Sequence, residues 1–214
     1  RGEREGIGLF RANGQILGEF AHISIRTTPM LGGACTMRES ITMPPELRKA
    51  AISLVEAIDL EGYSQVEFRR DANGRPLLME VNSRLSGSIE LASRAGVDFA
   101  LMTWQWASGG PVQASRGYRS GVRLRWLAGD GRWLLETLRA PERPDATPAL
   151  RAIAGFTWDF ARSRAYDFVD AGDLMPAVAE GARVLAKLGQ KLSRPPRLEI
   201  PPADALGTIW YQER

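Results

Sequence analysis

The chain has 214 residues, of which 44% are hydrophobic and 25% charged, a composition typical of a globular protein with a full core. The formal charge is only +3 and the arginines are spread along the chain, which argues against a nucleic-acid surface. No apolar run reaches the length of a membrane span, and the lone Cys35 excludes an internal disulfide and fits a reducing cytosol.

Two strand-like runs open the chain on either side of Asn13-Gly14. Residues 6–11 and 15–24 both contain Ile, Leu and Phe, and an Asn-Gly pair favours a tight turn. We therefore expect an antiparallel hairpin. His22, the only histidine, falls on a polar strand face, where a structural role is favoured over nucleophilic catalysis.

The next segment, residues 26–40, breaks periodicity at a proline and a Gly-Gly pair, and we expect an ordered loop. Glycine lets backbone N–H groups approach an anion, and arginine binds carboxylate or phosphate through paired hydrogen bonds. Arg26, Gly32, Gly33 and Arg38 are therefore candidate substrate contacts. A surface connection with two solvated arginines explains the pattern equally well.

Apolar residues recur at helical spacing from Leu47 to Ile58, with Pro45 at the start and Gly62 just beyond the end. The single apolar stripe predicts a helix packed against a sheet. Hairpin, loop, helix and second hairpin together predict an α+β fold, an antiparallel sheet covered by helices on one face.

The second hairpin lies in the stretch from Gly62 to Ser88. Residues 64–70 and 77–82 have strand character and flank Asn73-Gly74, which we take as the two turn residues. Side chains alternate along a strand, so one face of this hairpin is apolar and is expected to be core. Its members are Val66, Phe68, Leu77, Met79 and Val81.

Counting outward from that turn places Glu67 opposite Glu80 and Gln65 opposite Asn82, all on the polar face. Two carboxylates opposite each other repel and need compensation. An Asn oxygen near Glu80, with Arg84 beyond, suits a hard cation that also holds phosphate, so a Mg²⁺ site is predicted. A polar face whose carboxylates simply stay solvated is the alternative, and an odd-length loop would turn Glu67 away from Glu80.

Further helices are expected after the hairpin. Ser88 is predicted to cap a helix ending at Gly96, and Asp98 to cap a second one ending near residue 107. Residues 118–127 alternate like a strand whose basic face is solvated. Helices are predicted at 130–138 and from Thr147-Pro148 to about 163. The segment 166–176 leads into a last predicted helix, which ends near 192. A proline-rich linker follows at 193–202.

Four separated motifs carry a family resemblance over residues 6–109. They are Gln65-Val-Glu67-Phe, Met79-Glu80-Val-Asn82-Ser-Arg84, Gly87-Ser88-Ile-Glu-Leu-Ala92 and Ala95-Gly96-Val-Asp-Phe99. Their order resembles the C-terminal half of the ATP-grasp fold, found in ATP-dependent carboxylate-amine ligases such as biotin carboxylase and carbamoyl phosphate synthetase.

The resemblance implies ATP with Mg²⁺ or Mn²⁺ as cofactors. By this resemblance, Glu67, Glu80 and Asn82 hold the metal that bridges the ATP phosphates. Arg84 contacts phosphate or acyl-phosphate and is the expected catalytic residue. The loop from Arg26 to Arg38 is similar to the substrate-side loop of uncharacterised bacterial ATP-grasp proteins. Ser86 and Ser88 complete the candidate substrate contacts.

The family's adenine pocket, phosphate-binding lysines and glycine-rich lid lie N-terminal to the residues that match. The three lysines, Lys49, Lys187 and Lys191, have no suitable context. We therefore expect a segment of a longer protein that is inactive alone. We divide it into a C-terminal ATP-grasp subdomain at 1–110 and a strand-plus-helical extension at 111–214.

The expected activity is ATP-dependent conversion of a carboxylate to an acyl-phosphate, which an amine then attacks. We expect small-molecule carboxylate and amine substrates, a cytoplasmic location, no nucleic acid and no membrane, and we allow for a homodimer. A Mg²⁺-dependent phosphohydrolase is one alternative, although Glu90 and Asp71 are poorly placed as further acidic groups. A non-catalytic ATP-grasp-derived binding module is another, against which the intact Glu67, Glu80 and Asn82 argue.

Overall fold

The structure is a computed structural model that describes residues 3–29, 32–139, 147–163, 165–170 and 172–192. In chain order the elements are β1 (Arg4–Ala12), β2 (Gln15–Thr28), β3 (Ala34–Ser40), α1 (Pro45–Ala57), β4 (Gly62–Arg70), β5 (Pro76–Asn82), α2 (Ile89–Ala95), α3 (Phe99–Ala107), β6 (Arg123–Arg125), α4 (Leu127–Arg139), α5 (Ala149–Arg162), β7 (Ala165–Tyr166) and α6 (Met175–Leu192).

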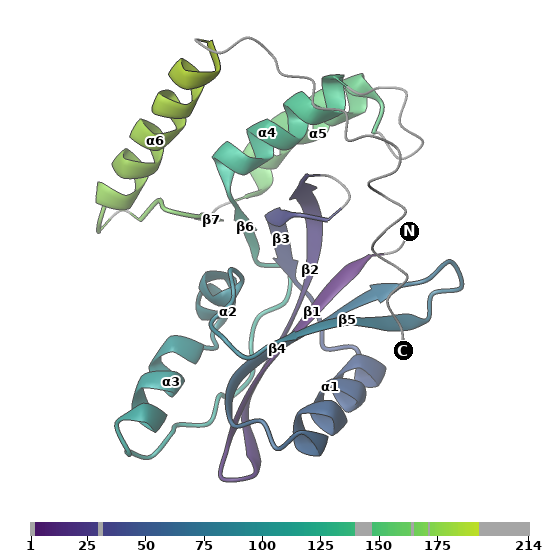
Figure 1. Cartoon of the computed structure of the whole chain (residues 1–214), viewed down its shortest axis with the longest axis vertical. Helices are drawn as coiled ribbons and strands as arrows, with labels where there is room; N and C mark the ends of the chain where they lie inside the picture. The colour runs from purple at the N-terminus through teal and green to yellow at the C-terminus, as the bar shows by residue number, and fades with distance from the viewer. Residues whose placement is uncertain (1–2, 30–31, 140–146, 164, 171, 193–214) are drawn as a thin grey trace, which may run out of the picture.

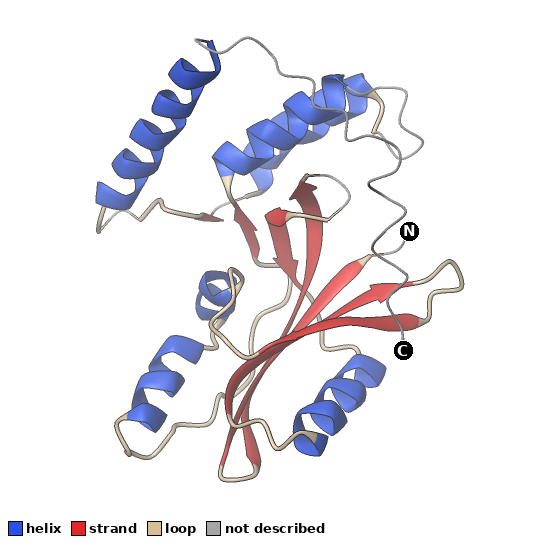
Figure 2. Ribbon diagram, viewed as in Figure 1, coloured by secondary structure: helices blue, strands red, loops and turns tan. Residues whose placement is uncertain are grey.

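These strands form one seven-stranded sheet in the order β5-β4-β1-β2-β3-β6-β7 (Figure 2). Neighbouring strands are antiparallel except β6 and β7, which are parallel. The predicted α+β class with an antiparallel sheet is confirmed. The two hairpins predicted from Asn-Gly pairs, β1–β2 and β4–β5, also form.

Helices cover both faces of the sheet, so the expectation of one covered face is wrong (Figure 1). Alternation along β1 sends Ile7 and Leu9 to one side, where they join Leu47, Ala51 and Val55 of α1 in a buried cluster. Residues pointing to the other side form a second cluster with α2 and α3. Its largest buried members are Phe10, Phe20, Phe99, Leu91 and Leu124.

Residues 26–40 are mostly strand, and the predicted ordered loop is wrong. Strand β2 continues through Thr28 and β3 begins at Ala34, so only a short connection lies between them. The irregularity that the sequence suggested is present as two register shifts around Arg26 in the β2–β3 pairing. Pairing of β3 with β6, far along the chain, favours strand despite the local breakers.

The predicted helices of the second half are confirmed as α4, α5 and α6, and Asp98 caps α3 by accepting a hydrogen bond from the Leu101 amide. The strand predicted at 118–127 shrinks to the three residues of β6. Its basic face is not solvated, because Arg125 is fully buried. The proline-rich segment 193–202 lies outside the described residues.

Strands β6 and β7 belong to the same sheet as β1–β5, and α4, α5 and α6 gather at their end of it (Figure 1). The division near residue 110 stays a prediction. Within the described residues, no helix has the length and apolar character needed to cross a bilayer.

Candidate active site

The β4–β5 hairpin has the pairing predicted for its base. Glu67 faces Glu80 and Gln65 faces Asn82. The tip differs from the prediction because Asp71 organises a longer turn: its carboxylate accepts hydrogen bonds from the amides of Asn73 and Arg75.

A β-bulge reconciles the longer turn with the predicted pairing. At the tip, Phe68 pairs with Leu78, and one residue further along β4, Glu67 pairs with Glu80. Met79 is therefore an extra residue on β5, and it shifts the register by one between tip and base. The odd-length turn that would have separated the two glutamates is present, but the bulge cancels its effect.

Only part of the apolar face of this hairpin is core. Val66 and Phe68 on β4 are buried against α1, whereas Leu77 and Met79 on β5 are more than half exposed. The core assignment of these two residues is wrong. The bulge sets Leu77 opposite Arg69, on the face away from Val66 and Phe68, and α1 does not reach across the edge strand β5 to the tip of the hairpin.

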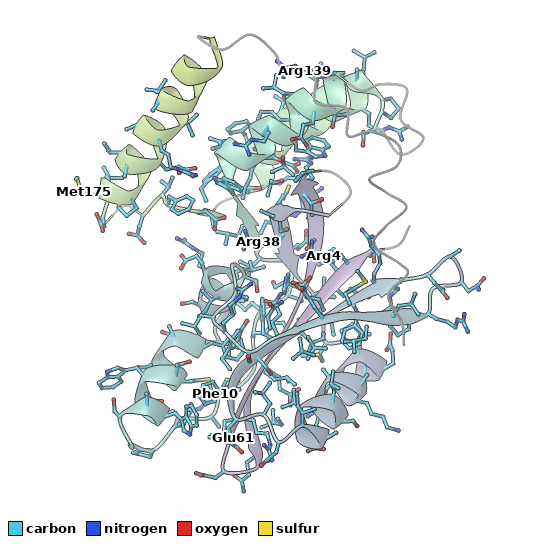
Figure 3. The ribbon with its side chains drawn as sticks, in the orientation of Figure 1. Arg4, Phe10, Arg38, Glu61, Arg139 and Met175 are labelled. Atoms are coloured by element: carbon cyan, nitrogen blue, oxygen red, sulfur yellow. The ribbon has the colours of Figure 1, made fainter. Side chains whose placement is uncertain are left out.

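The polar face of the hairpin opens into a cavity of about 770 Å³. Strands β1 to β5 form its floor, the segment from Arg84 to Glu90 forms one side, and residues from Trp126 onward form another. It is lined by Arg4, His22, Ser24, Ala34, Cys35, Arg38, Gln65, Glu67, Glu80, Asn82, Arg84, Ser86, Gly87, Ser88, Glu90, Trp126, Asp167, Phe168 and Arg183. Figure 3 shows Arg4 and Arg38 near the middle of the molecule, at this face.

The two glutamates differ in their surroundings. Glu67 is largely buried and accepts hydrogen bonds from Arg4 Nε at 2.8 Å and Gln65 Nε2 at 2.7 Å. Glu80 is exposed and accepts one from Asn82 Nδ2 at 2.8 Å. Arg4 supplies the compensating charge that two facing carboxylates require, and it lies at the rim of the cavity, where its side chain is 26% exposed.

The residues at the base of the hairpin fit a hard divalent cation. Glu67, Glu80 and Asn82 offer carboxylate and amide oxygens, the donors that Mg²⁺ prefers, and a Mg²⁺ site commonly adds waters and substrate phosphates to one or two carboxylates. In the described part of the chain, no three His, Cys, Asp or Glu side chains meet as a metal cluster. A cation here would therefore take only part of its coordination from the protein.

Ser86 and Ser88 lie together at the start of α2, in a buried chain of hydrogen bonds. Their hydroxyls are 2.8 Å apart, Ser88 donates to Gln65 Oε1 at 2.7 Å, and the Tyr63 hydroxyl is 2.7 Å from Ser86. The chain continues through Gln65 to Glu67. Both serines line the cavity, and their hydrogen bonds to Gln65 help to orient the Glu67 carboxylate.

The other predicted substrate residues separate into two groups. Arg38 lines the cavity, and its guanidinium donates to the carbonyls of Gly87 and Cys35 and to Asp167 Oδ2. Arg26 instead pairs with Asp130 at 2.9 Å and Asp159 at 2.5 Å, away from the lining residues.

The two glycines of the β2–β3 connection are not among the lining residues either. The Gly32 amide donates to the Pro29 carbonyl, and the Gly33 carbonyl accepts a hydrogen bond from Arg4 Nη1 at 3.1 Å. Of the four residues predicted in this segment, only Arg38 therefore reaches the cavity.

His22 is buried in the floor of the cavity, opposite Gly6 on β1. Burial, together with the charges of Arg38 and Arg4, lowers its pKa to about 3, so the imidazole is neutral at physiological pH. A Cβ at Gly6 would lie 2.3 Å from the imidazole Cε1, so the glycine is needed for this close packing. The expected structural role is consistent with this environment.

Several lining residues, Arg4 among them, were not identified as site residues from the sequence, and four of these come from the second half of the chain. Trp126, Asp167, Phe168 and Arg183 reach the cavity because β7 pairs with β6 and α6 follows it. Phe168 has a φ of 66°, rare for a bulky residue. No sequence motif marks these positions.

Comparisons with known proteins identify the family. Residues 25–129 match the family model described as ATP-grasp in the biosynthetic pathway with Ter operon. A segment of 51 residues is 45% identical to the arginine-specific large chain of carbamoyl phosphate synthase from Lactiplantibacillus plantarum, covering 23% of this chain and 5% of that protein. The chain thus spans a small part of the curated relative it matches.

Two solved structures are also similar. Biotin carboxylase from Campylobacter jejuni aligns with a TM-score of 0.46 and 17% identity over 57% of this chain and 28% of that one. L-amino acid ligase from Bacillus licheniformis aligns with a TM-score of 0.41 and 19% identity over 49% and 29%. Together with the four motifs, the family match shows that the segment 25–129 of this chain belongs to the ATP-grasp superfamily.

Proposed function

We propose that the full-length protein is an ATP- and Mg²⁺-dependent ligase that activates a carboxylate as an acyl-phosphate for attack by an amine. The observation that carries the proposal is the register of β4 and β5, which sets Glu67 opposite Glu80 and Asn82 opposite Gln65 at one end of a large cavity. Arg84 follows directly and lines the same cavity.

In this proposal Glu67, Glu80 and Asn82 hold the metal, which would neutralise charge on the nucleotide phosphates. The Ser86–Ser88–Gln65 hydrogen bonds keep the Glu67 carboxylate oriented. Arg84 is exposed and has the fixed charge needed to stabilise the phosphoryl group during transfer.

The reaction has two balanced steps. A carboxylate oxygen of the acid substrate forms a bond to the γ-phosphorus while the bond to the β-phosphate oxygen breaks, which releases ADP. The amine nitrogen then bonds to the acyl carbon while the C–O bond to phosphate breaks, and the nitrogen loses a proton. Small-molecule acid and amine substrates, a cytoplasmic location and the division near residue 110 are parts of the same proposal.

The test is Glu80→Gln in the full-length protein, with Mg²⁺-dependent ADP release measured over a panel of carboxylic acids. Loss of a metal carboxylate is expected to reduce turnover about 100- to 1000-fold, corresponding to several kcal/mol of lost charge stabilisation. The matched control is Glu46→Gln. That carboxylate is exposed at the start of α1 and pairs with Arg70 rather than facing the cavity. Equal turnover in Glu80→Gln and the control would refute the metal assignment.

A further inference from the structure

The cavity has a second polar wall, which is separate from the hairpin and is built by the C-terminal part of the chain. Strand β7 lies parallel to β6, and the Asp167 amide donates to the Arg125 carbonyl at 3.0 Å. This contact holds Asp167 and Phe168 at the cavity. Trp126 and Arg183 complete the wall from the end of β6 and from α6.

Asp167 has one carboxylate oxygen with no protein donor in the described ranges. Its Oδ2 accepts from Arg38 Nη2 at 3.2 Å, a long contact, while Arg38 also donates to two main-chain carbonyls. No described residue donates to Oδ1. The side chain is 14% exposed, and burial raises its pKa above the ordinary aspartate value. This partly exposed oxygen at the cavity wall is open to a hydrogen-bond donor from a ligand.

The nearby cations already have acidic partners. Arg183 donates two hydrogen bonds to Glu180, and Arg94 pairs with Glu90. Among the residues that the structure describes, this wall therefore presents no unpaired arginine that would attract a second carboxylate, and an anion placed beside Asp167 would be repelled by it. A positively charged group is the complementary ligand.

Aromatic surface adjoins the carboxylate. Phe168 is 49% exposed and is held at a φ of 66°, a strained conformation for a bulky residue that often marks functional sites. The Trp126 indole N–H donates to Glu180 at 3.0 Å, which fixes the ring at the cavity wall. The two rings provide an apolar surface next to the one free carboxylate oxygen.

We propose that this wall is the acceptor subsite of the cavity, where Asp167 receives the amino group of the attacking co-substrate and Phe168 and Trp126 contact an apolar or aromatic side group. This assignment rests on the proposed ligase function and names its amine class. The phosphoryl chemistry takes place on the opposite wall, at Glu67, Glu80 and Arg84.

The step at this subsite is balanced without a further reactant. The ammonium form binds with its N–H groups donating to Asp167 and loses one proton to that carboxylate. The free nitrogen lone pair then forms the C–N bond while the acyl C–O bond breaks, and the nitrogen loses its second proton to the phosphate that leaves.

The test separates this subsite from acyl-phosphate formation by using hydroxylamine. Hydroxylamine is small and uncharged at neutral pH, so it traps an acyl-phosphate as a hydroxamate without needing an ammonium subsite. In the full-length protein, the twenty L-amino acids are screened as acids with hydroxylamine, and then as amine acceptors for each acid that gives a hydroxamate.

Asp167→Asn is expected to keep hydroxamate formation within about twofold of wild type. It should raise the KM for the amine about tenfold or more, as loss of a charge-assisted hydrogen bond predicts. The control is Asp170→Asn in the same loop. Asp170 accepts from the Gly172 amide and lies outside the main cavity, so both reactions should be unchanged.

Three outcomes overturn the subsite. They are an unchanged amine KM in Asp167→Asn, an equal loss of hydroxamate and amide formation, and a loss of amide formation matched by Asp170→Asn. Thermal unfolding of each variant shows whether loss of the contact between Asp167 and Arg38 destabilises the protein and so explains a lower activity. Absence of hydroxamate with every acid in the wild-type protein would instead contradict the proposed function itself, so the two failures are distinguishable.

Discussion

Charged residues at the two ends of the sheet differ in their burial and in the partners they contact. At the β5 edge, Glu80 is exposed, and within the described ranges its hydrogen-bond partner is the neutral amide of Asn82. At the β6 end, Arg125 is fully buried, pairs with Asp130 at 2.7 Å and lies 4.3 and 4.4 Å from the ring centres of Phe156 and Phe160. A charge that is buried with its partner destabilises the fold when that partner is removed, whereas a charge left with a weak partner is available to a ligand.

The largest expected effect lies at the buried end. Asp130→Asn keeps the shape of the side chain but leaves Arg125 buried without its only acidic partner in the described residues, and it also weakens the pairing of Arg26. A loss of about 3–5 kcal/mol in the free energy of unfolding is expected, measured by chemical denaturation.

Glu80→Gln removes an exposed carboxylate and should change the free energy of unfolding by less than about 0.5 kcal/mol. An equally small change in Asp130→Asn would contradict the proposed difference between the two ends. A double variant, Asp130→Asn with Arg125→Met, should recover part of the loss, because it removes the uncompensated charge.

A smaller effect is expected at His22, which faces the cavity but is buried like the charges at the β6 end. Its folded pKa of about 3 lies below the ordinary histidine value of 6.5, so both states are neutral above pH 6.5 and only the unfolded state binds the proton below it. Stability is therefore fully present above pH 6.5 and falls by up to about 1.4 kcal/mol per pH unit as the pH drops toward 3.

His22→Gln should remove this contribution. The measurement is the difference in unfolding free energy between wild type and variant from pH 7 to pH 4.5, which cancels the titration of the shared carboxylates. Parallel curves over that range would show that the imidazole titrates normally and is open to solvent.

The smallest effect is expected at the tip of β5. Leu78 is 52% exposed on the edge strand, so Leu78→Ser should change the free energy of unfolding by less than about 0.5 kcal/mol. Chemical denaturation provides the measurement. A cost near that of a buried leucine, about 2–5 kcal/mol, would mean that the β5 edge is covered in solution and would remove the contrast between the two ends.

Local signals predicted the parts of the fold that local chemistry decides. The Asn-Gly turns, the apolar stripe of α1 and the Asp98 cap all depend on residues close together in sequence. The pairing of Glu67 with Glu80 was also predicted, although the turn assumed for it was wrong. Asp71 lengthens that turn through its own hydrogen bonds to the backbone, and Met79 restores the register.

Long-range contacts decided the parts that could not be predicted. Residues 26–40 carry Pro and Gly breakers, and they form strands because β6 pairs with β3 from more than eighty residues away. The alternation of residues around Arg125 predicted a solvated face. This prediction was wrong because Phe156 and Phe160, which cover the guanidinium, belong to a later helix. Asp167 reaches the cavity through the two-residue β7, a pairing too short to leave a periodic signal.

The bulge at Met79 divides the β4–β5 hairpin into a tip and a base that have different pairing registers. Beyond the bulge, the tip from Phe68 to Leu78 has one register, and the base that carries Glu67 and Glu80 has another. Deleting Met79 would leave a regular ladder with the same two glutamates still opposite each other. A one-residue difference in the length of the turn can therefore be absorbed by the bulge without moving the proposed metal ligands, and the exposed hairpin tip is a natural place to insert a tag or probe.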